Sequence, residues 1–65
     1  MCEFKVIIEG NTVFKDAVYA KVDGSNVIVK DILGDLEEFN NCRIIEVNVT
    51  TQRLILSLNK NRILS

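Results

Sequence analysis

The chain has 65 residues, 48% of them apolar, and a formal net charge of -1. So short a chain supports one thin core, which excludes a multidomain architecture and predicts a single small domain over residues 1–65, with residues 59–65 as a loose tail. There is no histidine and the glycines are isolated, which excludes histidine-dependent catalysis, histidine metal sites and phosphate-binding loops. We therefore expect a protein that is not an enzyme.

The cysteines and the first residues indicate the cellular context. The two cysteines, Cys2 and Cys42, are too few for a disulfide framework. The opening run MCEFKVII is charged, and its apolar part is too short for a signal peptide or a membrane span. These features predict a cytoplasmic protein with reduced thiols and no membrane association. The high apolar fraction also predicts a homodimer, because a second copy would cover apolar surface that one thin core leaves exposed.

Alternating apolar and polar residues predict strands in the first third of the chain. Residues 3–9 carry apolar side chains on one face, as in a half-buried strand. Gly10-Asn11 then predicts a turn. A short return strand over residues 12–15 and a separate strand over residues 17–23 complete this part of the prediction.

The middle of the chain predicts a central hairpin. The run DGSN at residues 23–26 is the strongest turn signal, and residues 27–39, VIVKDILGDLEEF, follow it as two strands joined at Leu33-Gly34-Asp35. The first arm is apolar on both faces, which is typical of a central or interface strand. The second arm carries Glu37-Glu38 and predicts a water-facing edge. A helix over residues 30–39 is the competing interpretation, disfavoured because a glycine in mid-helix costs about 1 kcal/mol relative to alanine.

The last third predicts two more strands. Over residues 43–49 we expect Ile44 to point outward and the following side chains to point inward: Ile45, Val47 and Val49. Leucines alternate over residues 54–58 and are expected inside. About six short strands with frequent turns predict an all-β fold, either a small SH3-like barrel or a strongly bent antiparallel sheet. The candidate residues of a dimer face are Ile7, Ile28, Ile32, Ile44 and Ile55.

Two patterns are compatible with binding rather than catalysis. Neighbouring aromatic and basic residues would form a stacking strip for RNA: Phe4 and Lys5, Phe14 and Lys15, and Tyr19 and Lys21. Such pairs are also ordinary in β proteins. Cys42 is interpreted as a buried small apolar residue.

The second pattern is the amino-terminal Met1-Cys2-Glu3. Removal of Met1 leaves Cys2 with a free α-amine and a thiol that together close a five-membered chelate ring. Nitrogen donors with thiolate sulfur suit nickel(II) or copper(II), and a second chain would complete four ligands. The alternative is a Cys2 without a role in binding.

Four segments in their order resemble the CooT-like family of small nickel-binding or predicted RNA-binding β proteins. They are Met1-Cys2-Glu3, Asp31-Ile32-Leu33-Gly34, Arg43-Ile44-Ile45-Glu46-Val47-Asn48 and Arg53-Leu54-Ile55-Leu56. The resemblance extends from Met1 to about Leu58. It departs from the family pattern near Asn41 and Cys42, where a glycine is expected before the Arg-Ile pair.

The resemblance implies a cytoplasmic homodimer that acts as a nickel(II)-binding accessory protein. It further implies a role in maturation of a metalloenzyme, carbon monoxide dehydrogenase, which would be the protein partner. Carried over to this chain, the metal-ligand role falls on Cys2 alone. The family's other label, a small RNA-binding module, is the alternative function.

Overall fold

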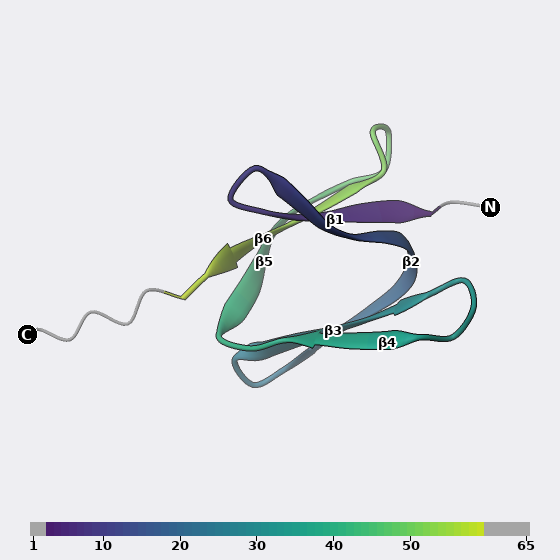
Figure 1. Cartoon of the computed structure of the whole chain (residues 1–65). Coiled ribbons are helices and arrows are strands. Elements are labelled where there is room, and N and C mark those ends of the chain that lie inside the picture. Colours follow the sequence, from purple (N-terminus) through teal and green to yellow (C-terminus); the bar gives the residue numbers. More distant parts are fainter. Residues whose placement is uncertain (1–2, 60–65) are drawn as a thin grey trace, which may run out of the picture.

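The computed structural model describes residues 3–59, which form one mixed sheet of six strands (Figure 1). The strands are β1 (Phe4–Ile8), β2 (Asn11–Asp23), β3 (Asn26–Asp31), β4 (Leu36–Phe39), β5 (Cys42–Asn48) and β6 (Arg53–Leu58). Their order across the sheet is β4-β3-β2-β1-β6-β5. The all-β prediction is confirmed: the sheet is strongly bent and does not close into a barrel. It is mixed and not purely antiparallel, because β1 and β6 pair in parallel.

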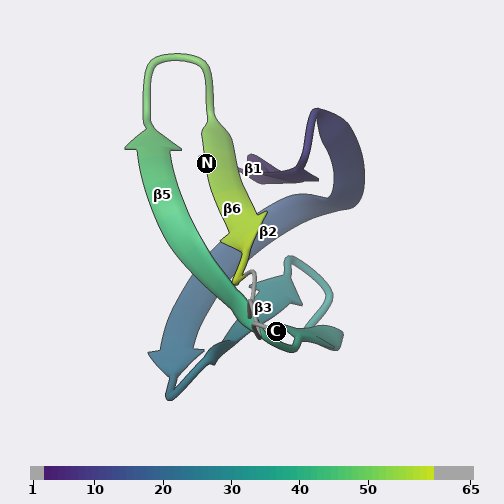
Figure 2. The same ribbon diagram turned by 90° about the vertical axis from the view of Figure 1, so that its left-hand side faces the viewer.

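A single long strand, β2, produces the bend. The two strands expected over residues 12–15 and 17–23 are one strand of 13 residues, so that prediction was wrong. Between them Asp16 has a φ of 60°, and the pairing with β1 shifts there, as at a β-bulge. A bulge bends its strand and increases the local twist. As Figure 2 shows, β2 therefore curves from β1 across to β3.

The core lies between the two halves of the bent sheet. Every strand except β4 contributes to its fully buried side chains: Val6, Ala17, Val27, Val29, Cys42, Leu54 and Leu56. The ring of Phe14 on β2 meets that of Phe39 on β4 edge to face, with centroids 6.5 Å apart. This contact connects the edge strand β4 to the first half of β2. Packing between the two halves of the sheet therefore stabilises the bend.

The central hairpin forms as predicted, with different boundaries. Val27 and Val29 of β3 are fully buried, and no helix forms over residues 30–39. β3 ends at Asp31, and Leu33 lies in the turn, as predicted, with its side chain exposed. β4 is an edge strand, and its Glu37-Glu38 pair is exposed as predicted.

The predicted orientation of β5 was wrong. Ile44 packs against the core, whereas Ile45 and Val49 are exposed. Burial of Cys42 sets the alternation, because side chains two residues apart share a face. A register shift between Ile44 and Glu46 then turns Val47 to the side of Ile44, opposite Leu54, where Val47 lines an open groove and stays 58% exposed.

The turn before β5 is tied to the turn before β3. The side-chain carbonyl of Asn26 accepts a hydrogen bond from Asn41 N at 3.2 Å, and Ser25 O accepts one from Cys42 N at 2.9 Å. Asn41 has a φ of 60°, a left-handed conformation that asparagine tolerates better than most residues. Asn41 therefore supplies a left-handed turn geometry that is more often supplied by glycine.

Replacing Asn41 tests this interpretation. Asn41→Ala should lower the free energy of unfolding by about 2 kcal/mol, because it adds left-handed strain and removes the hydrogen bond from Asn41 Nδ2 to Asn59 O. Asn41→Gly loses only the hydrogen bond and should cost less than about 1 kcal/mol. Urea denaturation of both variants measures the difference. Equal losses would show that the backbone conformation is not the constraint.

Candidate functional site

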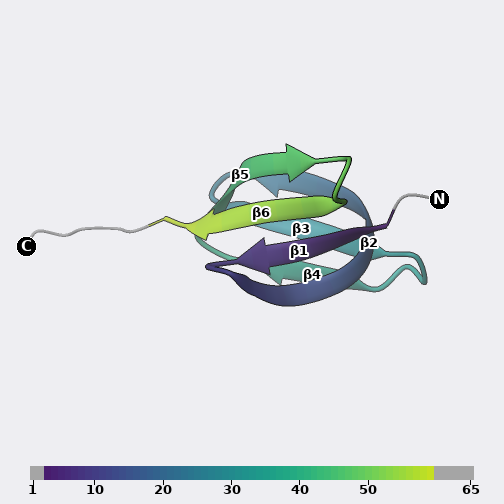
Figure 3. The same ribbon diagram turned by 90° about the horizontal axis from the view of Figure 1, so that it is seen from above.

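The start of β1 and the turn between β3 and β4 lie at the same end of the molecule (Figures 1 and 3). Phe4 pairs with Ala17 on β2, and Ala17 pairs in turn with Asp31 on β3. One row of the sheet therefore joins Phe4 to Asp31 across two strand spacings, about 10 Å. The Asp31–Gly34 turn, one of the segments that resemble the family, therefore lies at the same end of the sheet as the start of β1.

The loop between β5 and β6 completes this end of the molecule. Lys5 N donates to Gln52 O at 2.9 Å, and Lys5 lies in register with Arg53 at the start of β6. The loop itself is closed by a hydrogen bond from Thr51 N to Asn48 Oδ1 at 3.1 Å. The backbone that follows Glu3 is thus fixed on both sides, by β2 and by β6.

Asp31 organises the turn between β3 and β4. Its carboxylate oxygen Oδ1 accepts hydrogen bonds from Leu33 N and Asp35 N, both at 2.9 Å. Its backbone oxygen accepts one from Gly34 N at 3.0 Å, and Gly34 has a φ of 93° that suits glycine. A further bond from Ile32 N to Asp16 O, at 3.1 Å, ties the turn to the bulge of β2. The sequence analysis did not predict that Asp31 accepts hydrogen bonds through both its side chain and its backbone. An aspartate just before a tight turn is nevertheless the usual signal of this role.

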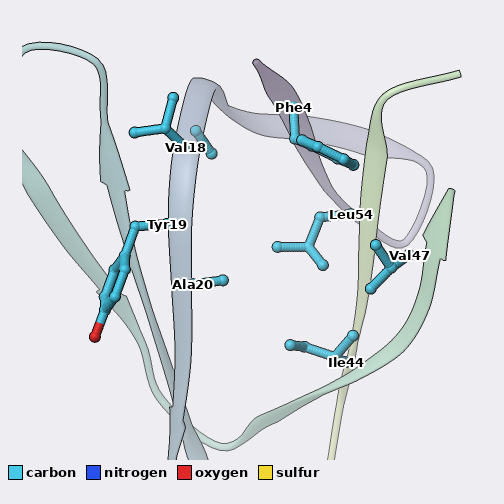
Figure 4. A pocket seen from close by; sticks show the side chains of 8 residues that line it. Phe4, Val18, Tyr19, Ala20, Ile44, Val47 and Leu54 are labelled. Carbon is cyan, nitrogen blue, oxygen red and sulfur yellow. The ribbon is translucent and has the colours of Figure 1, made fainter. Parts of the chain in front are cut away.

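An open apolar groove of about 290 Å³ begins beside Phe4 (Figure 4). Its walls come from β2 on one side and from β1, β5 and β6 on the other: Phe4, Ala17, Val18, Tyr19, Ala20, Ile44, Val47 and Leu54. Tyr19 turns its hydroxyl away from the groove, and its ring carries the Lys30 ammonium 5.1 Å from the centroid. The sequence analysis missed this groove, because it forms only where the bulges of β2 and β5 bring these strands face to face.

The two cysteines occupy different situations. Cys42 is 2% exposed and free, and its Sγ donates to Asn40 O at 3.4 Å, so its predicted role as a core residue is confirmed. Cys2, the predicted metal ligand, lies outside the described residues. Within residues 3–59 no three His, Cys, Asp or Glu side chains cluster as metal ligands would.

The predicted RNA strip does not form a continuous exposed surface. Phe4 and Phe14 pack against the core, and Tyr19 alone of the three aromatics is exposed. The isoleucines proposed for a dimer face do not share one face either. Ile7 and Ile55 are half-buried register partners on the side of β1 and β6 opposite the core, whereas Ile44 packs on the core.

This architecture is that of a small all-β protein built on one open, strongly bent sheet. The chain belongs to the CooT family, described as CO dehydrogenase accessory protein CooT, whose family model matches residues 1–57. No curated protein sequence matches the chain. No helix able to cross a membrane occurs in residues 3–59, where the regular structure is strand.

Asp31 gives a direct test of how the turn is held. Asp31→Ala removes the acceptor for Leu33 N and Asp35 N and should lower stability by about 1–2 kcal/mol. It should also speed hydrogen exchange of both amides. Asp31→Asn keeps an oxygen acceptor and should preserve most of the protection. Unchanged exchange in Asp31→Ala would mean that the backbone alone fixes the turn.

Proposed function

We propose that the protein is a non-enzymatic, cytoplasmic accessory protein that binds nickel(II) and serves maturation of carbon monoxide dehydrogenase. The observation that carries this proposal is the match to a CO dehydrogenase accessory family over residues 1–57, a range that includes Cys2. In the proposal nickel is cargo, passed on to an enzyme that uses it.

The chemistry of the amino terminus suits the ion. After removal of Met1, Cys2 would offer its α-amine and thiolate, and the amide nitrogen of Glu3 would be a further donor. This mixture of nitrogen and sulfur favours nickel(II) or copper(II) over harder ions. Binding releases protons from these groups, so affinity should fall as the pH falls.

A second copy of the chain would complete the ligand set. One chain supplies at most three of the donors named above, and two chains related by a twofold axis supply enough for four-coordination. The apolar groove is the surface that we assign to the second copy. Its lining includes Phe4, which is two residues along the chain from Cys2, so a second copy in the groove would contact the start of β1.

Native mass spectrometry of tag-free protein with one equivalent of nickel(II) tests the metal site. We expect one nickel per dimer and a chain mass that lacks Met1. Cys2→Ser should lose the metal, because a hydroxyl is a poor substitute for thiolate. Cys42→Ala is the matched control: it removes a buried sulfur and should keep the nickel. Undiminished nickel binding by Cys2→Ser would contradict the proposal.

Sedimentation equilibrium tests the dimer surface. Val47→Glu places a charge in the groove and should raise the dimer dissociation constant at least tenfold, because a charge buried without a partner is strongly unfavourable. Val22→Glu is the control, since Val22 is similarly exposed, at 54% against 58%, and lies outside the groove. An equal effect of both substitutions, or none of either, would assign the dimer to another surface.

RNA binding is the alternative function, and no contact in the described residues favours it. It predicts affinity that falls steeply with salt and survives Cys2→Ser. Filter binding at two salt concentrations separates this alternative from the metal proposal.

A further inference from the structure

The turn between β3 and β4 presents a small apolar tip to solvent. Three side chains within five residues are exposed: Leu33 at 81%, Leu36 at 61% and Ile32 at 48%. Single exposed apolar residues are ordinary, but a cluster at the apex of a turn forms a patch. We call Ile32, Leu33 and Leu36 the apolar tip. Leu33 buries too little surface for core packing to explain its position.

The backbone under the apolar tip is rigidly held. Asp31 Oδ1 fixes the amides of Leu33 and Asp35, and Asp31 N donates to Asp35 O at 3.0 Å. The bond from Ile32 N to Asp16 O anchors the turn to β2. A surface held in place before binding loses less conformational entropy on association. Rigidity combined with exposure is the arrangement expected of a recognition element.

The negative charge around the apolar tip limits the kinds of partner that could bind it. The segment 31–38 contains four acids and no base: Asp31, Asp35, Glu37 and Glu38. The nearest cation along the chain, Lys30, has its ammonium over the Tyr19 ring. The four carboxylates form an acidic rim around the tip, and this rim would repel an anionic membrane or a nucleic acid. A second copy meeting the tip about a twofold axis would place like charges together. A protein pocket that is apolar inside and bordered by Lys or Arg is complementary to both features.

We propose that the apolar tip is the docking element for the client enzyme, inserting Leu33 into an apolar pocket with a basic rim on nickel-free carbon monoxide dehydrogenase. The inference rests on the proposed maturation role and adds the surface and the chemistry of its partner site. Position supports it, because the row Phe4–Ala17–Asp31 places the tip and the start of β1 at one end of the sheet. Docking through the tip would therefore bring the start of β1 close to the client.

Biolayer interferometry with purified, nickel-free carbon monoxide dehydrogenase tests the proposal. Leu33→Ala should raise the dissociation constant at least tenfold, as for a side chain that fills a pocket at the centre of an interface. Val22→Ala is the matched control, an exposed apolar residue near the turn between β2 and β3, and should leave the constant within twofold. Because Leu33 is 81% exposed, its truncation should leave the urea midpoint unchanged.

Three further variants separate the effect of the turn's shape from the effect of its charge. Asp31→Ala should weaken docking about as much as Leu33→Ala, and Asp31→Asn much less, because only the first removes the acceptor that holds the turn. Asp35→Lys should weaken docking mainly at low salt, because salt screens exposed charges. Equal binding by wild type and Leu33→Ala would overturn the proposal.

Other outcomes identify other occupants or separate the two proposals. Loss of the dimer in Leu33→Ala would show that the tip binds a second copy of the chain. Retention of wild-type protein on anionic vesicles would show that it binds a membrane. Either result would overturn the assignment of the tip to the client enzyme. If wild-type protein fails to bind the nickel-free enzyme, docking is overturned whatever the nickel result. If docking is intact while wild-type protein takes up no nickel, the metal function fails and the docking surface stands.

Discussion

The bulge at Asp16 is the constraint on which the rest of the structure depends. It divides β2 into a part that pairs with β1 and a part that pairs with β3, and Ala17 is the residue that has partners on both sides. Without the bend, a sheet of this size would have no interior. With it, the two halves face each other and bury one small core, and Asp16 O is positioned to accept the hydrogen bond from Ile32 N. The same feature therefore creates the core and positions the apolar tip.

Function in so small a chain depends on the placement of a few groups. The row Phe4–Ala17–Asp31 and the bond from Lys5 N to Gln52 O gather the start of β1, the tip turn and the β5–β6 loop at one end. The start of β1, the Phe4 end of the groove and the apolar tip thus lie at the same end of the sheet. Each proposed role uses different physics: thiolate coordination, burial of apolar surface, and a rigid turn with an acidic rim.

The groove and the tip are both apolar, but they differ in what they can receive. The groove is concave and its lining contains no charged residue, which suits a surface of the same chain. The tip is convex and bordered by carboxylates, which suits a partner of opposite charge. The two surfaces are separate, so the proposed dimer and the proposed docking on a client would be compatible with each other.

The sequence by itself determined most of the strands, the central hairpin with Leu33 in its turn, the edge position of Glu37-Glu38 and the burial of Cys42. These follow from local rules, since alternation has a period of two and glycine marks tight turns. The order of four short segments along the chain also indicated the family. Tertiary structure decided that β2 is a single bent strand, that Ile44 turns inward and that β1 pairs in parallel with β6. A bulge changes the alternation by one residue, and pairing between distant strands depends on contacts that no local pattern encodes.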